Sequence, residues 1–493
     1  MDLIERIDRW GELAPDRPVH VSGGRRLTYR ELIRGSDALA AHLSELLPDD
    51  RSPVVVLGHK EPEMLIGFLG VVKSGRPYVP VDTVLPPQRV ERVVQVAGAR
   101  LTLTPERVAE MSDTETPKRT DEDKGPSSSR LRADDPYYIM FTSGSTGEPK
   151  GVVITLGNLT SFLDWLLAEQ AFAEGETFLN QVPYSFDVSF MDTYAALLTG
   201  GTVFSVTRED IANPKQLYRS LAESGLTTWV STPSFAQLCL IERSFNREML
   251  PVVGRFLFCG ETLPPEVAAR LLDRFPGAEV WNTYGPTEAT VATTSIRVDR
   301  GLLERYSPLP IGYPMAGTRV VVLDPDGREA APGERGEIAI AGPNVSPGYL
   351  GRPDLTERAF FELDGLPAYR TGDWGRARDG LLFCEGRMDN QIKLHGHRIE
   401  LGDVEANLRS LPGVRDAVVL PVVRRDRVDS LAAFVILAER AAGSDFEQAN
   451  ALRARLAERV PVYMLPRKFL FREAFPMTAN GKADRRSLAE ALA

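Results

Sequence analysis

Cysteine, histidine and long apolar runs are all scarce in this chain of 493 residues. Its three cysteines are odd in number and far apart, which argues against a disulfide framework and favours a reducing cytoplasm. Of the five histidines only His395 and His397 lie close together, so a structural metal site is not expected. No apolar run approaches membrane-spanning length, and residues 1–10 lack the apolar region of a signal peptide.

Lysine is scarce too, with nine lysines against 49 arginines. This bias looks like the coding preference of a GC-rich genome and changes solubility little. The formal net charge of −10 argues against nucleic acid as a partner. From Asn390 onward, however, the chain carries 17 Lys and Arg against 13 Asp and Glu. This local excess is either chance or a means for the C-terminal part to hold an acidic partner.

The most informative segment is residues 138–151, with the sequence YIMFTSGSTGEPKG. Its apolar beginning predicts a short buried strand, which leads into a loop of glycines and hydroxylated residues closed by Lys150. Glycines let backbone amides approach an anion, hydroxyls donate hydrogen bonds and lysine adds a charge, so the loop predicts a polyphosphate site. A Walker A loop would need glycine at 149 and Ser or Thr at 151, where this chain has Pro149 and Gly151. A flexible surface loop would need neither the buried strand nor the lysine.

Further motifs follow in chain order: residues 282–288 (NTYGPTE), 369–373 (YRTGD), 386–393 (GRMDNQIK) and 480–482 (NGK). With the phosphate loop they resemble the motifs of the adenylate-forming superfamily, which includes acyl-CoA synthetases, luciferases and the adenylation domains of peptide synthetases. The matching segments span most of the chain in the family's order. A second set is similar to the D-alanine:carrier-protein ligases in particular: residues 180–192 (NQVPYSFDVSFMD), 231–240 (STPSFAQLCL) and 256–261 (FLFCGE).

Strand and helix patterns alternate up to about residue 300, which predicts an α/β protein of layered, mostly parallel sheets. Helix starts are readable, as at Thr28 with Glu31 three residues later, and a further helix is expected over residues 61–73. Residues 112–135 are polar and aperiodic and predict an exposed loop. From about residue 318, short strands and Pro-Gly turns predict a small β-barrel-like subdomain.

The tail after Asp389 predicts a small, mobile α+β domain, so the expected domains are residues 1–388 and 389–493. Its patterns predict the following elements: a hairpin, helices over 401–411 and 445–459, and strands over 417–421 and 431–437.

Adenylation requires a carboxylate to attack the α-phosphate of ATP, so the site must neutralise two anions and hold them in line. The loop residues expected to hold the β- and γ-phosphates are Thr142, Ser143, Gly144, Ser145, Thr146, Gly147 and Lys150. The resemblance implies ATP and Mg²⁺ as cofactors, with Thr287 on the α-phosphate and Glu288 on Mg²⁺. A lone Thr-Glu pair would otherwise be a helix N-cap.

The resemblance also implies an adenine pocket. Tyr284 would stack on the base and Asn282 would hydrogen-bond its amino group, while the pocket is lined by Thr283, Gly260 and Glu261.

Asp373 is expected to accept both ribose hydroxyls, because a carboxylate offers two acceptors. Arg387 would reach the same ribose; a surface salt bridge is the alternative for this arginine. Lys482 follows a turn pair, Asn-Gly, that can present a side chain. By resemblance Lys482 is the catalytic lysine that bridges the substrate carboxylate and the α-phosphate.

The second half-reaction, attack of a thiol on the acyl-adenylate, needs room that Lys482 would occupy. In the family the small domain rotates about a hinge aspartate, here Asp389. Rotation would bring the hairpin from Lys393 to Gly396 to the site, where glycine lets the pantetheine arm pass.

The substrate pocket is predicted by motif alignment. Asp187 matches the aspartate that binds the α-ammonium in amino-acid-activating relatives, with a nearby arginine as the alternative partner. The other positions are Phe186, Val188, Met191, Leu257, Cys259, Thr283, Val291 and Ala292. Met191 and Leu257 are bulky, which restricts the substrate side chain to methyl or hydroxymethyl. Cys259 stands where the D-alanine ligases carry a cysteine that shapes stereochemical preference, although most free cysteines are small core residues.

The sequence therefore predicts a free-standing ligase that adenylates alanine, D-alanine first, and loads it on the phosphopantetheine of a separate carrier protein. The arginine bias keeps open a relative that loads L-alanine, glycine or serine in a secondary-metabolite pathway. An acyl-CoA ligase is less expected because of Asp187. An inactive binding protein is disfavoured by the presence of Lys150, Glu288, Asp373 and Lys482. We expect a cytoplasmic protein with no nucleic-acid partner and no membrane insertion.

Overall fold

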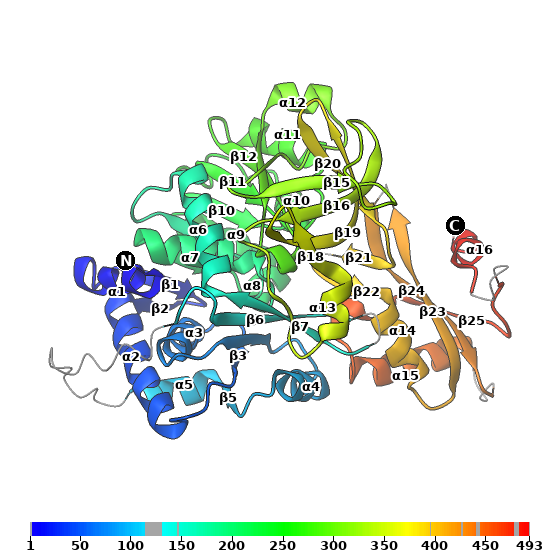
Figure 1. Ribbon diagram of the computed structural model, residues 1–493, viewed down its shortest axis with the longest axis horizontal. Coiled ribbons are helices and arrows are strands. Elements are labelled where there is room, and N and C mark those ends of the chain that lie inside the picture. The colour runs from blue at the N-terminus through cyan, green and yellow to red at the C-terminus, as the bar shows by residue number, and fades with distance from the viewer. Residues whose placement is uncertain are drawn as a thin grey trace. The chain divides into compact units, whose positions relative to one another are not determined.

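The computed structural model (Figure 1) describes residues 2–113, 131–144, 147–394, 396–424, 427–439, 444–477 and 483–492. The chain forms two compact units. The first comprises residues 1–82, 97–140 and 151–388; the second comprises residues 83–96, 141–150 and 389–493. The second unit thus takes in two short segments of the N-terminal third besides the tail that starts at Asp389. The predicted division into domains 1–388 and 389–493, and the hinge role of Asp389, stay predictions.

The first unit contains the largest sheet of the described residues. Its nine strands run in the order β14 (Tyr313–Pro314), β13 (Thr294–Val298), β12 (Glu279–Tyr284), β11 (Arg255–Phe258), β10 (Thr228–Ser231), β8 (Thr177–Asn180), β9 (Thr202–Ser205), β1 (Pro18–Ser22) and β2 (Arg25–Thr28). Neighbours from β12 to β1 pair in parallel, whereas the outer strands β13, β14 and β2 pair antiparallel. The carboxyl ends of the parallel strands therefore meet at one edge, where α/β proteins bind ligands.

A second large sheet has the described strand order β17 (Gly348–Tyr349), β7 (Lys150–Thr155), β6 (Pro136–Thr142), β4 (Tyr78–Asp82), β3 (Val54–Gly58) and β5 (Leu101–Leu103). Helices α2 (Tyr29–Leu46), α3 (Glu63–Lys73) and α5 (Pro105–Ser112) pack on one another beside this sheet (Figure 1). The predicted capping box is confirmed, since Thr28 and Glu31 cap α2 reciprocally. The helix predicted over residues 61–73 begins later, at Glu63, because Glu61 turns back to accept the backbone N–H of His59 at 2.6 Å.

One apolar core joins the two large sheets. Helix α7 (Val188–Thr199) packs against β8, β9 and β10, and all of its residues from 188 to 198 are buried. Its Phe190 meets Tyr138 of β6 edge to face, with ring centroids 4.7 Å apart. Phe68 of α3 stacks on Tyr78 of β4 at 4.5 Å. Other helices of the first unit are α1 (Leu3–Leu13), α6 (Leu156–Gln170), α8 (Arg208–Ala212), α9 (Pro214–Glu223), α10 (Pro233–Cys239), α11 (Pro265–Arg274), α12 (Arg300–Arg305) and α13 (Pro353–Ala359).

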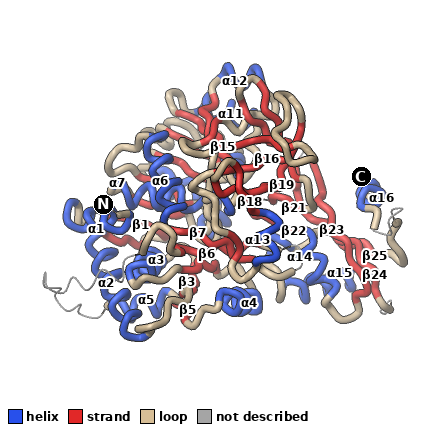
Figure 2. The backbone as a smooth tube through the Cα atoms, viewed as in Figure 1, coloured by secondary structure: helices blue, strands red, loops and turns tan. Residues whose placement is uncertain are grey.

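The segment predicted to be β-barrel-like forms a five-stranded antiparallel sheet (Figure 2). Its strands are β15 (Arg319–Leu323), β16 (Arg335–Ala341), β19 (Leu366–Arg378), β18 (Phe360–Leu363) and β20 (Leu381–Arg387). The predicted mixed α/β architecture, with a small α+β part at the C-terminus, is confirmed.

The second unit is built around a three-stranded sheet of β23 (Val414–Arg424), β24 (Arg427–Leu437) and β25 (Lys468–Phe471). It also contains α4 (Pro87–Ala97), the hairpin β21 (Gln391–Leu394) and β22 (His397–Glu400), and the helices α14 (Leu401–Arg409), α15 (Asp445–Ala457) and α16 (Arg485–Glu490). The first two of the three strands are longer than predicted, because β23 and β24 stay paired through two register irregularities into polar sequence. Of the loop predicted over 112–135, residues 114–130 lie outside the described part.

No helix in the described part of the chain is both long and apolar enough to cross a membrane.

Tyr29 offers a test of the first unit's packing. Its buried hydroxyl lies 3.1 Å from the carbonyl oxygen of Ala196 and 2.9 Å from that of Gly201, so it links α2 to the end of α7. We expect Tyr29→Phe to lower the free energy of unfolding by about 1–3 kcal/mol, because buried carbonyls lose a donor. Urea unfolding measures the loss. Tyr313→Phe, at a tyrosine 57% exposed, is the control and should leave the midpoint unchanged.

Candidate active site

The predicted phosphate loop lies between β6 and β7. Thr142 ends β6 and Lys150 begins β7, while Ser145 and Thr146 lie outside the described residues. The loop closes on itself, because the backbone N–H of Gly147 donates to the carbonyl of Gly144 at 3.0 Å. A Cβ on Gly144 would lie 2.2 Å from the carbonyl oxygen of Glu148, so only glycine fits there. Ser143 Oγ donates to the backbone carbonyl of Arg398 at 3.1 Å.

The predicted adenine pocket lies where the parallel strands β11 and β12 end. Phe258 pairs with Asn282, so the residues after β11 lie beside the end of β12. Thr283 Oγ1 donates to the carbonyl of Phe258 at 2.8 Å. The Asn282 amide nitrogen donates to the carbonyl of Pro310 at 2.8 Å, which leaves its Oδ1 as the acceptor for an amino group. Glu261 accepts from the backbone N–H and Oγ of Ser234, at 3.0 and 2.5 Å, and so fixes the start of α10.

The predicted ribose ligand Asp373 joins three motifs. Its Oδ2 accepts from the Tyr284 hydroxyl at 2.6 Å, and its Oδ1 accepts from Arg387 Nη1 at 3.1 Å. Arg387 Nη1 also donates to the carbonyl of Thr371 at 2.7 Å. Burial raises the pKa of Tyr284, and the neighbouring Asp373 carboxylate adds to the effect, so the hydroxyl stays a donor. Residues 89 positions apart are thus in direct contact.

Thr287 and Glu288 lie in a short 3₁₀ turn, Thr287–Ala289, after β12. Glu288 is fully buried, and its Oε1 accepts from the Tyr349 hydroxyl at 2.8 Å. The two residues that follow the 3₁₀ turn, Thr290 and Val291, have φ of +55° and +66°, a conformation that residues branched at Cβ rarely adopt. Such strain persists only where the surroundings enforce it, and it is concentrated at functional sites.

Asn344 holds this strained loop. Its Nδ2 donates to the carbonyl of Ala289 at 2.8 Å and to Thr293 Oγ1 at 3.0 Å, and its own carbonyl accepts from Thr290 Oγ1 at 2.7 Å. Neither Asn344 nor Tyr349 was among the predicted residues. Their contacts with the segment from Glu288 to Thr293 join residues 51 to 61 positions apart, and no local pattern marks such a contact.

Most of the predicted pocket residues belong to the large apolar core of the first unit. These core residues are Val188, Met191, Leu257, Cys259, Val291 and Ala292, and the partly buried Phe186 packs against the same core. Cys259 Sγ lies 3.7 Å from the carbonyl oxygen of Val291, so the end of β11 touches the strained loop. Asp187 immediately precedes α7 and is 7% exposed, yet its carboxylate makes no capping bond to that helix.

A buried polar network holds the segment that leads from β8 to α7. Asn180, at the end of β8, donates to Asp192 Oδ1 of α7 at 2.7 Å and accepts from Lys60 and Ser205. Lys60 also donates to the carbonyl of Val182 at 2.5 Å. Burial raises the pKa of the Asp192 carboxyl, and the Lys60 ammonium partly opposes this. Sequence reasoning missed Lys60, whose neighbours give it no recognisable motif.

The remaining predicted residues lie in the second unit. Asp389 is exposed, and its Oδ1 accepts from the backbone N–H of Gln391 at 3.0 Å. Lys393 is exposed on β21, and Gly396 takes φ of +83° in the turn before β22. Lys482 lies outside the described residues. Among the residues that the structure describes, no cluster of three His, Cys, Asp or Glu could hold a metal ion.

Residues 7–350 match the model of the AMP-binding enzyme family, and residues 403–482 match that of the AMP-binding enzyme C-terminal domain. The chain belongs to the AMP-binding enzyme family. It is 47% identical to a D-alanine–D-alanyl carrier protein ligase of Bacillus mycoides (strain KBAB4) and 46% identical to one of Bacillus cereus (strain Q1), in each case over 99% of both chains. The family's use of ATP makes the chain an ATP-dependent ligase.

Solved structures are similar over nearly the whole chain. An artificially fused adenylation–PCP di-domain NRPS from Klebsiella oxytoca is 25% identical, with a TM-score of 0.79 over 95% of this chain and 93% of that chain. The Vibrio cholerae adenylation domain AlmE, in complex with glycyl-adenosine-5′-phosphate, has a TM-score of 0.84 at 20% identity, over 99% and 97% of the two chains. The second likeness concerns the fold alone.

Asp373 tests the nucleotide pocket of this family member. We expect Asp373→Ala to weaken ATP binding about 10- to 100-fold, because a hydrogen bond to a charged group contributes about 1.5–3 kcal/mol. Isothermal titration calorimetry with ATP measures the dissociation constant. Asp326→Ala, whose side chain is 74% exposed in a turn, is the control. An unchanged constant in Asp373→Ala would contradict the assignment of this carboxylate to ribose.

Proposed function

We propose that the chain activates D-alanine with ATP and transfers it to the phosphopantetheine thiol of a separate carrier protein. One observation carries the proposal: the predicted pocket residues of the apolar core, Cys259 among them, and Asp187 are all buried, in a family member whose full-length relatives are named D-alanine–D-alanyl carrier protein ligases. An acidic carrier would suit the basic excess of the tail. ATP and a reduced carrier thiol are both present in the cytoplasm, the compartment that we propose.

In the first half-reaction, a carboxylate oxygen of D-alanine attacks the α-phosphorus of ATP. The new P–O bond forms as the bond to pyrophosphate breaks, and D-alanyl-adenylate results. Tyr284 stacks on adenine, Asn282 accepts from its amino group, and Asp373 accepts from the ribose hydroxyls. The hydrogen bonds that now link Tyr284 and Arg387 to Asp373 support this role, because they orient the carboxylate before the nucleotide arrives.

The phosphates need positive charge and donors. We assign the β- and γ-phosphates to the loop from Thr142 to Lys150 and the α-phosphate to Thr287. Glu288 fits a magnesium site, since Mg²⁺ is commonly held by one or two carboxylates together with substrate phosphates and water. Glu288 would hold the ion, which would supply positive charge against the negative charge that develops on pyrophosphate as it leaves. Tyr349 supports this assignment, because its hydroxyl orients the Glu288 carboxylate.

The amino acid is recognised at two ends. The Asp187 carboxylate pairs with the α-ammonium, and the apolar residues of the predicted pocket enclose the methyl group. Met191 and Leu257, both fully buried, close the floor against larger side chains.

In the second half-reaction, the carrier thiol loses its proton and attacks the carbonyl carbon of the adenylate. A thioester forms and AMP leaves. We propose that Lys482 serves only the first half-reaction, and that residues 389–493 turn about Asp389 so that the Lys393–Gly396 hairpin admits the pantetheine arm.

The ammonium site can be tested by substrate preference. We expect Asp187→Ala to reduce alanine-dependent pyrophosphate exchange about 10- to 100-fold, because the substrate ammonium loses a charged partner. Exchange with propionate, which has no ammonium, should change little, and ATP binding should be retained. Asp164→Ala, at an exposed carboxylate of α6, is the control. A mutant with the wild-type preference for alanine over propionate would show that Asp187 does not bind the amine.

Pyrophosphate exchange with D-Ala, L-Ala, Gly, Ser, Leu and Phe tests the proposed function as a whole. D-alanine should be the best substrate, and Leu and Phe should fail, because overpacking a core costs about 1–3 kcal/mol or more. L-alanine should retain modest activity, since a methyl-sized contact discriminates by only about 10- to 200-fold. Cys259→Ala should bring the exchange rates with D-alanine and L-alanine closer together.

Each other outcome of this assay has a definite meaning. Leucine as the best substrate would refute the small pocket. L-alanine as the best substrate would favour a ligase of the same class in another pathway. An unchanged D/L ratio in Cys259→Ala would refute the role of that thiol.

A further inference from the structure

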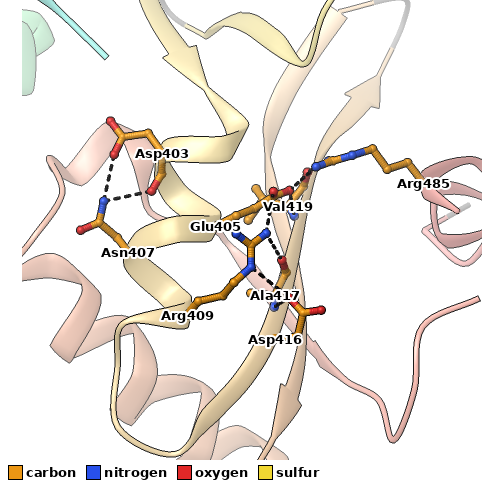
Figure 3. Close-up of polar contacts among 8 residues, drawn as sticks. All are labelled: Asp403, Glu405, Asn407, Arg409, Asp416, Ala417, Val419 and Arg485. Carbon is orange, nitrogen blue, oxygen red and sulfur yellow. Dashed lines mark hydrogen bonds and ion pairs between the residues drawn. The ribbon is translucent and has the colours of Figure 1, made fainter. Parts of the chain in front are cut away.

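A buried carboxylate organises the second unit. Glu405 of α14 is 4% exposed, and it accepts three hydrogen bonds (Figure 3). The backbone N–H of Val419 donates to Oε1 at 2.8 Å, Arg485 Nη2 donates to Oε1 at 2.5 Å, and Arg409 Nη2 donates to Oε2 at 3.1 Å. A carboxylate this deeply buried is stable only with such partners.

Arg485 connects three elements through one side chain. It begins α16, its Nη2 reaches Glu405 on α14, and its Nη1 donates to the carbonyl of Val419 on β23 at 2.9 Å (Figure 3). Arginine suits this position because its planar guanidinium presents two donors in a fixed fork, which a lysine cannot reproduce.

The chain is also fixed on both sides of residues 478–482. Met477 and Ala483 form an antiparallel bridge, and the backbone N–H of Asp484 donates to the carbonyl of Pro476 at 2.7 Å. Phe475 before the bridge and Leu488 after it are buried in one apolar cluster on the three-stranded sheet. Within this arrangement Arg485 supplies the polar link to α14.

We infer that Arg485 is a positioning residue for adenylation. Its hydrogen bonds to Glu405 and to the carbonyl of Val419 anchor the chain three residues after Lys482, and this anchor limits where Lys482 can lie. The inference rests on the proposed function, which gives Lys482 its role in the first half-reaction. Misplacement of a reacting group by about 1 Å can cost about 100-fold in rate, so a firm base matters for a lysine that must meet two anions at once.

Arg409 provides a matched control. It donates to the same Glu405 carboxylate, and further to the carbonyl of Ala417 at 3.1 Å and to Asp416 at 2.9 Å (Figure 3). Its contacts join α14 to β23 and leave α16 untouched. Arg409→Met and Arg485→Met therefore each remove one positively charged partner of the Glu405 carboxylate. Only Arg485→Met also loosens the segment that follows Lys482.

The test separates the two half-reactions in the full-length chain. Arg485→Met should lower kcat of D-alanine-dependent pyrophosphate exchange about 10- to 100-fold, with thioester formation from supplied D-alanyl-adenylate within about threefold of wild type. Lys482→Ala should show the same split, more severely. Arg409→Met should lose comparable thermal stability and leave both half-reactions within about threefold. Arg485→Lys keeps the positive charge but loses the two-donor fork of the guanidinium, so its kcat of pyrophosphate exchange should lie between those of Arg485→Met and wild type. If Arg485→Met fails to fold, Arg485→Lys takes its place in the test.

Hydrogen exchange gives a readout that is independent of activity. Amides of residues 476–484 should exchange faster in Arg485→Met than in wild type, and should be unchanged in Arg409→Met. Equal loss of both half-reactions in Arg485→Met, or the same split in Arg409→Met, would overturn the inference. Full adenylation by Lys482→Ala would instead refute the role proposed for Lys482, and the inference with it, even if the difference in hydrogen exchange were found; the proposed substrate would still be decided by the panel of amino acids.

Discussion

The parallel pairing of β11 with β12 is the constraint on which the site depends. Phe258 lies opposite Asn282, so the residues that follow β11 start beside the end of β12. A slip by one residue would turn every side chain of a strand to its other face. It would take the Thr283 hydroxyl away from the carbonyl of Phe258 and the Tyr284 hydroxyl away from Asp373. The predicted nucleotide pocket and the proposed amino-acid pocket would therefore both depend on this one register.

The two key carboxylates of the first unit share one physical solution. Asp373 and Glu288 are both buried, and each accepts a hydrogen bond from a tyrosine hydroxyl, Tyr284 and Tyr349 respectively. Burying an ionised carboxylate is costly unless donors replace the lost water. A phenol supplies such a donor without adding a charge, and at Asp373 the guanidinium of Arg387 supplies a second donor that is charged.

Much of the fold could be predicted because its signals are local. Alternating strand and helix patterns fixed the architecture, and the Thr28 and Glu31 pair marked a helix start to the residue. Motifs also singled out Tyr284 and Asp373, and the structure brings them into contact. What sequence could not supply were contacts between segments without a motif. Asn344 supports the loop after β12 from 51 to 55 residues away, and nothing in its neighbourhood predicts that partner.

Backbone conformation was equally invisible in the sequence. A valine with positive φ violates the preference of its own side chain, so local propensity predicts against what tertiary contacts impose at Val291. The same limit applies to Lys60, because its burial and its hydrogen-bond partners result from the packing of segments more than 100 residues apart.

The left-handed backbone at Thr290 and Val291 has a consequence for any redesign of the proposed amino-acid pocket. The carbonyl of Val291 contacts Cys259 Sγ. A smaller residue at 291 would therefore create space beside Cys259, and it would also relax the strained backbone that brings this carbonyl to the thiol. Volume and backbone geometry cannot be varied separately there. Met191 is different, since it lies on the regular helix α7 and its backbone would survive a shorter side chain. Evolution toward larger amino acids would therefore be easier from the helical side of the pocket than from the loop side.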